Sequence, residues 1–138
     1  MRSLGLDLGS VTCGVAVSDA LGIVARTVKT IRFNEDDYES CLKQVLLVIN
    51  EFEPIQQIVL GLPKHMNGDV GIRGEICIKF KEMLEEKTDI PIILWDERLT
   101  TVIAQKTLIS ADVSRKKRKK VVDQIAAVTI LQSYLDRN

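Results

Sequence analysis

Carboxylates at three distant places in the chain are the residues best suited to chemistry. Asp7 interrupts an apolar segment, LGLDL, where an ionised side chain is costly without a partner. Asp96 and Glu97 follow the apolar segment PIILW, and Asp123 lies in the largely apolar segment VVDQIAAVTIL. If these carboxylates converge, their mutual repulsion favours a divalent cation, and all-oxygen ligation favours Mg²⁺ or Mn²⁺. Ions of this kind activate water and stabilise the leaving oxygen in phosphodiester hydrolysis.

Each of these carboxylates also has a structural explanation that the sequence leaves open. Asp7 can be a turn aspartate at the end of a strand. Asp96 can pair with Arg98 at the surface, while a threonine of the segment DERLTT caps the helix that follows. Asp123 lies one helical turn after Lys119, so an ordinary i, i+4 ion pair also accounts for it. It is therefore the convergence of these carboxylates, and no single one of them, that would indicate a metal site.

A run of six consecutive basic residues, which we name the basic run, is the second feature with chemical meaning. It consists of Arg115, Lys116, Lys117, Arg118, Lys119 and Lys120. The chain has 19 basic and 19 acidic residues, so 13 basic residues face 19 acidic ones outside the basic run. This segregation is expected where acidic residues hold a metal and basic residues hold a polyanion, although a solvated lysine-rich loop gives the same pattern. Together with Arg98, the basic run is our candidate nucleic-acid contact.

Motifs that the sequence lacks argue against several other chemistries. It has neither GxxxxGK[ST] nor GxGxxG, which argues against a P-loop NTPase and a dinucleotide enzyme. His65 is the single histidine, so an HExxH zinc site is impossible, and no GxSxG elbow supports a serine triad. Cys13, Cys41 and Cys77 share no CxxC spacing, which argues against a disulfide framework or a zinc cluster. The N-terminus, MRSLGLDLGS, has no continuous apolar stretch, so we expect a soluble, cytoplasmic protein without a signal peptide or membrane span.

The apolar pattern predicts elements that can bring the candidate residues together. Three short segments rich in Val, Ile and Leu, at residues 3–8, 13–18 and 23–33, are joined by glycine-containing links too short for a helix. Such links predict antiparallel strands. Strands and helices then alternate, which predicts parallel strands with helical crossovers. The expected order is a helix from residue 36 to Pro54, a strand at 57–61, a helix over 72–84, a strand at 91–95, a short helix over 100–109 and a final helix over 118–136.

These elements predict an α/β fold in one domain, residues 1–138, because 138 residues fit a single domain of ordinary size. We expect a mixed five-stranded sheet, built from an antiparallel meander plus parallel βαβα units, with helices on both faces. Sites in such sheets gather at the carboxyl edge of the strands. Asp7 and the pair Asp96 and Glu97 both come at predicted strand ends, so we expect them at that edge.

Four stretches of the sequence together resemble the YqgF family, also called the RuvX family, which has an RNase H-like fold. They are GLDLGSVTCGVAVSD at residues 5–19, VLGLPKHMNG at 59–68, DERLTT at 96–101 and KKRKKVVDQIAAVTILQSYL at 116–135. The resemblance covers essentially the whole chain and implies that Asp7, Glu97 and Asp123 form the acidic site. Asp96 can replace Glu97 as the ligand, because strand alternation turns neighbouring side chains to opposite faces and the sequence does not tell which one faces the site.

The resemblance implies a metal-dependent nuclease that acts on structured nucleic acid. Its expected role is the maturation of the 5′ end of pre-16S rRNA in ribosome biogenesis, with branched DNA, in particular four-way junctions, as the alternative substrate. A noncatalytic RNA- or ribosome-binding module stays open, because the family usually has a basic residue in the first turn and this chain has Val11 and Thr12 there. An ATPase-like phosphate binder is disfavoured because it needs a second lobe. We expect a monomer or a weak homodimer with no membrane partner.

Overall fold

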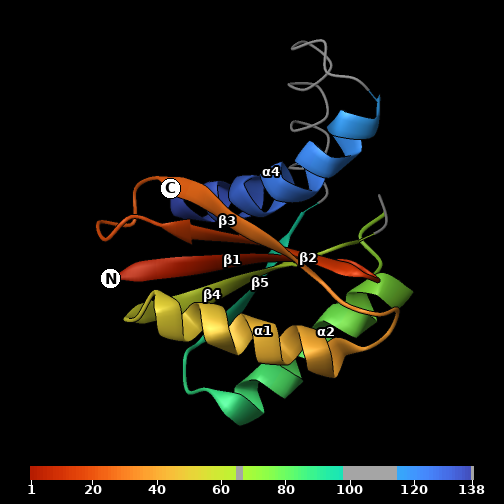
Figure 1. Ribbon diagram of the computed structural model, residues 1–138, viewed down its shortest axis with the longest axis horizontal. Helices are drawn as coiled ribbons and strands as arrows, with labels where there is room; N and C mark the ends of the chain where they lie inside the picture. Colours follow the sequence, from red (N-terminus) through yellow and green to blue (C-terminus); the bar gives the residue numbers. More distant parts are fainter. Residues whose placement is uncertain (65–66, 98–114, 138) are drawn as a thin grey trace.

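A computed structural model describes residues 1–64, 67–97 and 115–137, and for residues 115–124 it describes the backbone. The chain forms a five-stranded sheet with helices on both faces (Figure 1). The elements are β1 (Arg2–Leu8), β2 (Thr12–Ser18), β3 (Ala25–Arg32), α1 (Tyr38–Glu51), β4 (Ile55–Leu62), α2 (Ile72–Lys87), β5 (Ile92–Asp96) and α4 (Arg115–Leu135). The predicted short helix over 100–109 lies outside the described residues. No helix in the described ranges is long and apolar enough to cross a membrane.

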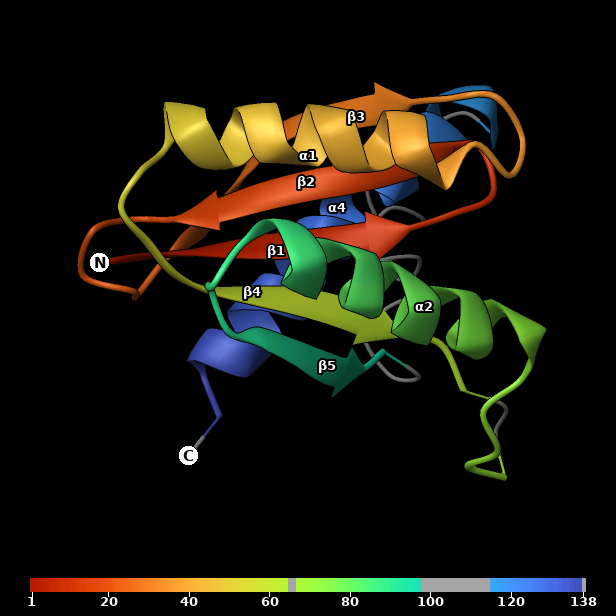
Figure 2. The same cartoon turned by 90° about the horizontal axis from the view of Figure 1, so that it is seen from below.

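The sheet is mixed, as predicted, and its strand order is β3-β2-β1-β4-β5. Strand β2 pairs antiparallel with β1 and β3, because short connections join these strands. Strands β1, β4 and β5 pair in parallel, through crossovers that contain α1 and α2. Figure 2 shows the arrows of β1, β4 and β5 pointing the same way and that of β2 pointing against them. The carboxyl ends of the three parallel strands therefore meet at one edge of the sheet.

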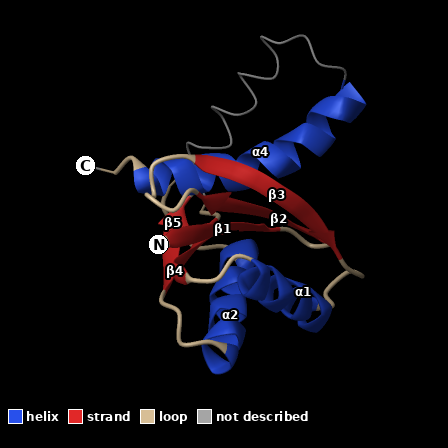
Figure 3. Ribbon diagram, turned by 60° about the vertical axis from the view of Figure 1, so that its left-hand side comes forward, coloured by secondary structure: helices blue, strands red, loops and turns tan. Residues whose placement is uncertain are grey.

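Two apolar cores lie on the two faces of the sheet. Figure 3 shows the helices that cover these faces, α1 and α2 on one side and α4 on the other. The larger core lies under α1 and α2, and the smaller one under α4. In β1, Leu4, Leu6 and Leu8 belong to the larger core, so the residues between them face α4. The three cysteines are free thiols buried in the larger core, consistent with their sequence spacing.

Helix α1 is formed by the three- and four-residue spacing seen in the sequence. The side chain of Asp37 caps it by accepting from the backbone N–H of Ser40 at 3.3 Å. Its buried residues are Cys41, Leu42, Val45, Val48 and Ile49. The helix ends at Glu51, shortly before Pro54, whose ring cannot continue a helix.

Helix α2 matches its prediction in position but not in every buried residue. The expected apolar face begins at Ile72, yet this side chain is 78% exposed. The residues buried on α2 are Gly74, Cys77, Phe80 and Leu84. Gly74 lies so close to the chain that precedes α2 that an added Cβ would come within 2.9 Å of the Pro63 carbonyl oxygen. The small residue brings the start of α2 against the end of β4.

Helix α4 packs closely on the sheet because small residues line the contact. A Cβ on Gly5 would lie 2.7 Å from Leu131 Cβ and 3.2 Å from the Ala127 carbonyl oxygen, which leaves no room for a side chain. The Tyr134 hydroxyl hydrogen-bonds the Gln57 side chain at 3.1 Å, near the start of β4. Since the last turns of α4 cover the start of the parallel strands, its first turns point toward their carboxyl edge.

The final helix begins earlier than the sequence predicted. We expected it over 118–136, and α4 begins at Arg115. The basic run is therefore part of the helix, in its first two turns. A lysine-rich loop, the alternative considered for the basic run, is excluded by the helical backbone.

Candidate active site at the carboxyl edge of the sheet

Asp7 lies near the carboxyl end of the central strand β1. It pairs with Gly14 of β2, and its neighbour Leu6 pairs with Leu60 of β4. Alternation along β1 places Asp7 on the same face as Gly5, which contacts α4. The side chain is half-buried. Asp7 is thus a carboxylate on the α4 face, at the edge where the sequence predicted it.

Glu97 immediately follows β5 and reaches over the neighbouring strand. Its backbone N–H donates to the Leu62 carbonyl oxygen at 3.3 Å, which extends the pairing of β4 with β5 by one residue. A Cβ added to Gly61 would collide with Glu97 Oε2 and would lie 2.6 Å from Ile130 Cδ1. Because Ile130 belongs to α4, the Glu97 carboxylate lies on the α4 face. Gly61 leaves the space that this carboxylate occupies.

The structure brings Asp7 and Glu97 into one electrostatic site. Burial, followed by the negative charges of Asp7 and Asp96, raises the pKa of Glu97 to about 7, while Arg73 opposes the rise. The burial penalty is the largest of these effects. Two carboxylates that repel each other at a partly buried edge form a donor set suited to a hard cation with oxygen ligands, such as Mg²⁺ or Mn²⁺.

Asp96 occupies a different position from Glu97, although the two are adjacent in sequence. Asp96 pairs with Leu62, whose side chain belongs to the core under α1 and α2. Within β5, Ile92 and Leu94 contact this same core, whereas Ile93 and Trp95 pack under α4. Alternation therefore puts Asp96 on the α1 and α2 face and leaves Glu97 with Asp7 on the α4 face.

Arg73 is a residue of this edge that the sequence analysis missed. It lies in the first turn of α2, where Nη2 donates to the Leu8 carbonyl oxygen at 3.5 Å and Nη1 to the Tyr38 hydroxyl at 3.4 Å. Its positive charge partly offsets the rise in the pKa of Glu97. No sequence motif marks Arg73. The one available signal is its place just after the loop that follows a predicted strand.

The remaining predicted site residues are described in part or not at all. Asp123 lies on the α4 backbone one turn before Ala127, and its side chain is not described. The same holds for the side chains of the basic run, while Arg98 lies outside the described residues. Within the part of the chain that the structure describes, no three His, Cys, Asp or Glu side chains are arranged to hold a metal ion. The described part of the site is therefore the pair Asp7 and Glu97, with Asp96 beside it.

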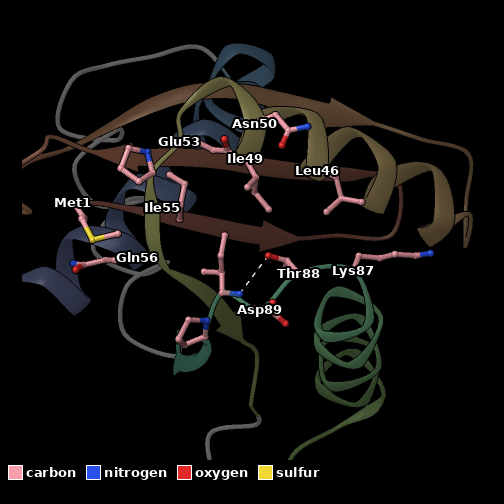
Figure 4. Close-up of a pocket in the computed structure, with 13 residues that line it drawn as sticks. Met1, Leu46, Ile49, Asn50, Glu53, Ile55, Gln56, Lys87, Thr88 and Asp89 are labelled. Carbon is pink, nitrogen blue, oxygen red and sulfur yellow. Dashed lines mark hydrogen bonds between the residues drawn. The ribbon is translucent and has the colours of Figure 1, made fainter.

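A cavity of about 910 Å³ lies at the opposite edge of the sheet (Figure 4). It is lined by the end of α1, the start of β4 and the connection from α2 to β5, including Ile49, Pro54 and Ile90. The Ile90 backbone N–H donates to the Thr88 hydroxyl at 3.3 Å along its wall. The cavity is separate from Asp7 and Glu97, which lie at the carboxyl ends of the strands.

Comparison with known proteins shows the family to which the chain belongs. Residues 1–137 match the RuvX family, described as "Holliday junction resolvase". A relative from Geobacillus sp. (strain WCH70), named "Putative pre-16S rRNA nuclease", is 55% identical over 136 residues, 99% of this chain and 98% of that protein. Among solved structures, T. thermophilus RuvC in complex with Holliday junction substrate has a TM-score of 0.59 at 13% identity, covering 99% of this chain and 96% of that chain. The fowlpox virus Holliday junction resolvase has a TM-score of 0.59 at 16% identity, covering 99% of each chain.

The two solved structures are too distant in sequence to show more than the fold. They confirm the RNase H-like arrangement of a mixed five-stranded sheet with helices on both faces. The family match and the 55% identical relative each span nearly the whole chain. The chain is therefore a member of the RuvX family, a family of nucleases described as Holliday junction resolvases.

Proposed function

We propose that this protein hydrolyses phosphodiester bonds in structured nucleic acid, using a divalent cation held by Asp7, Glu97 and Asp123. The observation that carries the proposal is the placement of the Asp7 and Glu97 carboxylates on the α4 face of the carboxyl edge, where the negative charge of Asp7 contributes to the raised pKa of Glu97. Partly buried carboxylates in this arrangement are stabilised by a cation between them. Mg²⁺ and Mn²⁺ are the ions whose ligand preference fits.

The course of α4 supports Asp123 as the third ligand. Ala127 contacts Gly5, two residues before Asp7 on the same face of β1. Asp123 precedes Ala127 by one helical turn, about 5.4 Å, and Asp7 follows Gly5 by two strand residues, about 6.6 Å, both toward the carboxyl edge. These similar advances from one contact support Asp7 and Asp123 as members of one ligand set.

The protein residues would hold the ion, fix the position of the strand that carries Asp7, and balance the charge around the site. When bound, a divalent ion would supply a water of lowered pKa and stabilise the leaving oxygen. Asp7 and Glu97 would hold this ion from the side of the sheet. Arg73 holds the end of β1 through the Leu8 carbonyl oxygen and offsets part of the negative charge around Glu97. Asp96 adds negative charge from the other face.

The proposed substrate is the precursor of 16S rRNA, cleaved near its 5′ end in the cytoplasm. This substrate follows from the name of the relative at 55% identity, whereas the two solved resolvase structures share 16% identity or less with this chain. The basic run supports a polyanionic substrate, because it is held in the turns of α4 nearest the carboxyl edge. Four-way DNA junctions are the alternative that the same experiment measures.

The test is cleavage by purified protein of a labelled pre-16S rRNA fragment and, in parallel, a labelled four-way DNA junction. Wild type, Asp7→Asn, Asp123→Asn and the control Asp89→Asn are compared in Mg²⁺, in Mn²⁺ and with chelator. Asp89 is an exposed carboxylate beside the cavity at the opposite edge. We expect the first two variants to lose on the order of a hundredfold or more in rate, because a ligand that acts in the transition state contributes several kcal/mol. Equal cleavage by all four proteins, or cleavage that persists in chelator, would contradict the proposal.

A further inference from the structure

Arg32 ends the edge strand β3 on the same face of the sheet as Asp7. Asp7 pairs with Gly14, and Gly14 pairs with Thr30, so these three residues form one row across β1, β2 and β3. The next row on the same face contains Thr12 and Arg32. Directly paired residues in antiparallel strands point to the same side. The Arg32 side chain therefore extends from the α4 face at the carboxyl edge.

The distance between Arg32 and Asp7 suits a substrate that crosses both. Two strand spacings and two residues along a strand put their Cα atoms about 12 Å apart. One strand of a nucleic-acid helix rises about 3.4 Å per nucleotide, so a phosphate bound at Arg32 would lie within about three to four nucleotides of the bond over Asp7. This separation places Arg32 for a phosphate that flanks the reacting one.

The backbone of Arg32 is fixed while its side chain is open to solvent. Its carbonyl oxygen accepts from Gln44 Nε2 at 3.2 Å, and the next residue, Phe33, donates its N–H to the Val11 carbonyl oxygen at 3.0 Å. The residue is exposed, and within the described ranges its guanidinium group makes no hydrogen bond or salt bridge. Because the backbone at Arg32 is already held, only the side chain has to be ordered when it binds an anion.

Arg73, a second arginine at this edge, makes contacts within the protein and lies on the other face of the sheet. Its guanidinium group contacts the Leu8 carbonyl oxygen and the Tyr38 hydroxyl on the α1 and α2 face. Arg32 therefore adds positive charge on the face where Asp7 and Glu97 lie. Outside the basic run the chain is net acidic, with 13 basic residues against 19 acidic ones.

We propose that Arg32 binds a backbone phosphate that flanks the scissile bond and so positions the nucleic acid over Asp7 and Glu97. The proposal rests on the proposed nuclease function. Its contact is with the sugar-phosphate backbone, which carries charge and no base identity, so Arg32 contributes to affinity and register equally for all sequences. Arginine suits the task because its planar group can donate two parallel hydrogen bonds to phosphate.

Lys29 provides a matched control on the same strand. It is exposed and carries the same charge as Arg32. Lys29 pairs with Val15, whose side chain belongs to the core under α1 and α2. Lys29→Gln therefore removes one positive charge from β3 on the face away from Asp7.

The experiment compares wild type, Arg32→Gln, Arg32→Lys and Lys29→Gln. Binding of the labelled pre-16S rRNA fragment and of the four-way DNA junction is measured between 50 and 300 mM salt with Ca²⁺ in place of Mg²⁺, and cleavage is measured in Mg²⁺. We expect Arg32→Gln to weaken binding several-fold and to reduce the salt slope by nearly one unit, as for one lost phosphate contact. KM should rise with little change in kcat, because a flanking contact binds substrate and transition state alike. Arg32→Lys should recover the slope, and Lys29→Gln should match wild type.

Two results would overturn the proposal. Equal losses in Arg32→Gln and Lys29→Gln would show a general effect of net charge, and a fall in kcat at unchanged KM would give Arg32 another role. The thermal unfolding midpoint of each variant checks the fold. If wild type binds both probes but cleaves neither, the nuclease proposal fails while the binding comparison still decides the role of Arg32.

Discussion

The Glu97 carboxylate occupies the space above Gly61 that any larger residue would fill. Gly61 lies on β4, between β5, which leads to Glu97, and β1, which carries Asp7. The absence of a side chain at this one position lets Glu97 lean toward the central strand. The shape of the acidic site thus depends on a residue without functional groups.

Gly61→Ala should move the Glu97 carboxylate away from Asp7. The added methyl group collides with Glu97 Oε2 and Ile130 Cδ1, which are the ends of two flexible side chains, so we expect these side chains to shift at little cost in stability. We expect cleavage to fall at least tenfold, measured as kcat with saturating substrate and metal. Gly22→Ala is the control: Gly22 has φ +73° and no atom near an added Cβ, so alanine there costs about 1–2 kcal/mol through the backbone alone. If both variants lose activity equally, reduced stability and not the position of Glu97 explains the loss.

The stability of the metal-free protein should fall as pH rises from about 4.5 to about 7. Folding raises the pKa of Glu97 from 4.5 to about 7, so the folded chain binds a proton that the unfolded chain releases. Stabilisation from this proton is fully present below pH 4.5 and is lost as pH passes 7, a change of about 3 kcal/mol. Urea unfolding in chelator, compared between wild type and Glu97→Gln, measures it. Parallel pH profiles for the two proteins would show that Glu97 titrates normally.

Glu97 and Asp96 should differ sharply in their contribution to activity. Glu97 lies with Asp7 on the α4 face, and Asp96 faces the other side through its pairing with Leu62. Glu97→Gln should reduce cleavage on the order of a hundredfold, whereas Asp96→Asn should reduce it only a few-fold through the loss of a nearby charge. Single-turnover cleavage in Mg²⁺ gives both values. The reverse order of effects would assign the ligand role to Asp96.

The comparison of these two carboxylates also shows what the sequence could and could not predict. The apolar segments predicted the strands and the mixed sheet, and interruption of an apolar strand marked Asp7. The sequence could not tell whether Asp96 or Glu97 faces the site, because this depends on the register of β5 against β4 and on the open space at Gly61. Arg73 was missed since its contacts with Leu8 and Tyr38 join segments far apart in the chain.

The start of the last helix was predicted three residues too late for a physical reason. Six adjacent like charges have no apolar period and repel one another, so local propensity gives little indication of helix. In the structure the basic run continues the helix of α4, whose later turns are held by packing on the sheet. Tertiary contacts of residues 126–134 thus support a charged segment that precedes them.

Replacement of four residues of the basic run with glutamine should lower nucleic-acid affinity without unfolding the helix. Glutamine has a helix propensity close to that of lysine and arginine, so α4 should keep its length. We expect the salt slope of binding to fall by about three to four units, nearly one for each lost phosphate contact, for RNA and DNA alike. Circular dichroism checks the helix content. An unchanged slope would place the binding face elsewhere on the protein.

The most direct test of the proposed metal site is anomalous diffraction from crystals of wild type and of Asp7→Asn grown with Mn²⁺. We expect an anomalous peak in wild type at about 2.1–2.2 Å from carboxylate oxygens of Asp7, Glu97 and Asp123, the coordination distance of small divalent cations. The peak should be absent or much weaker in Asp7→Asn. A wild-type crystal at saturating Mn²⁺ without a peak between these residues, or with Asp123 pointing away from Asp7, would contradict the central claim.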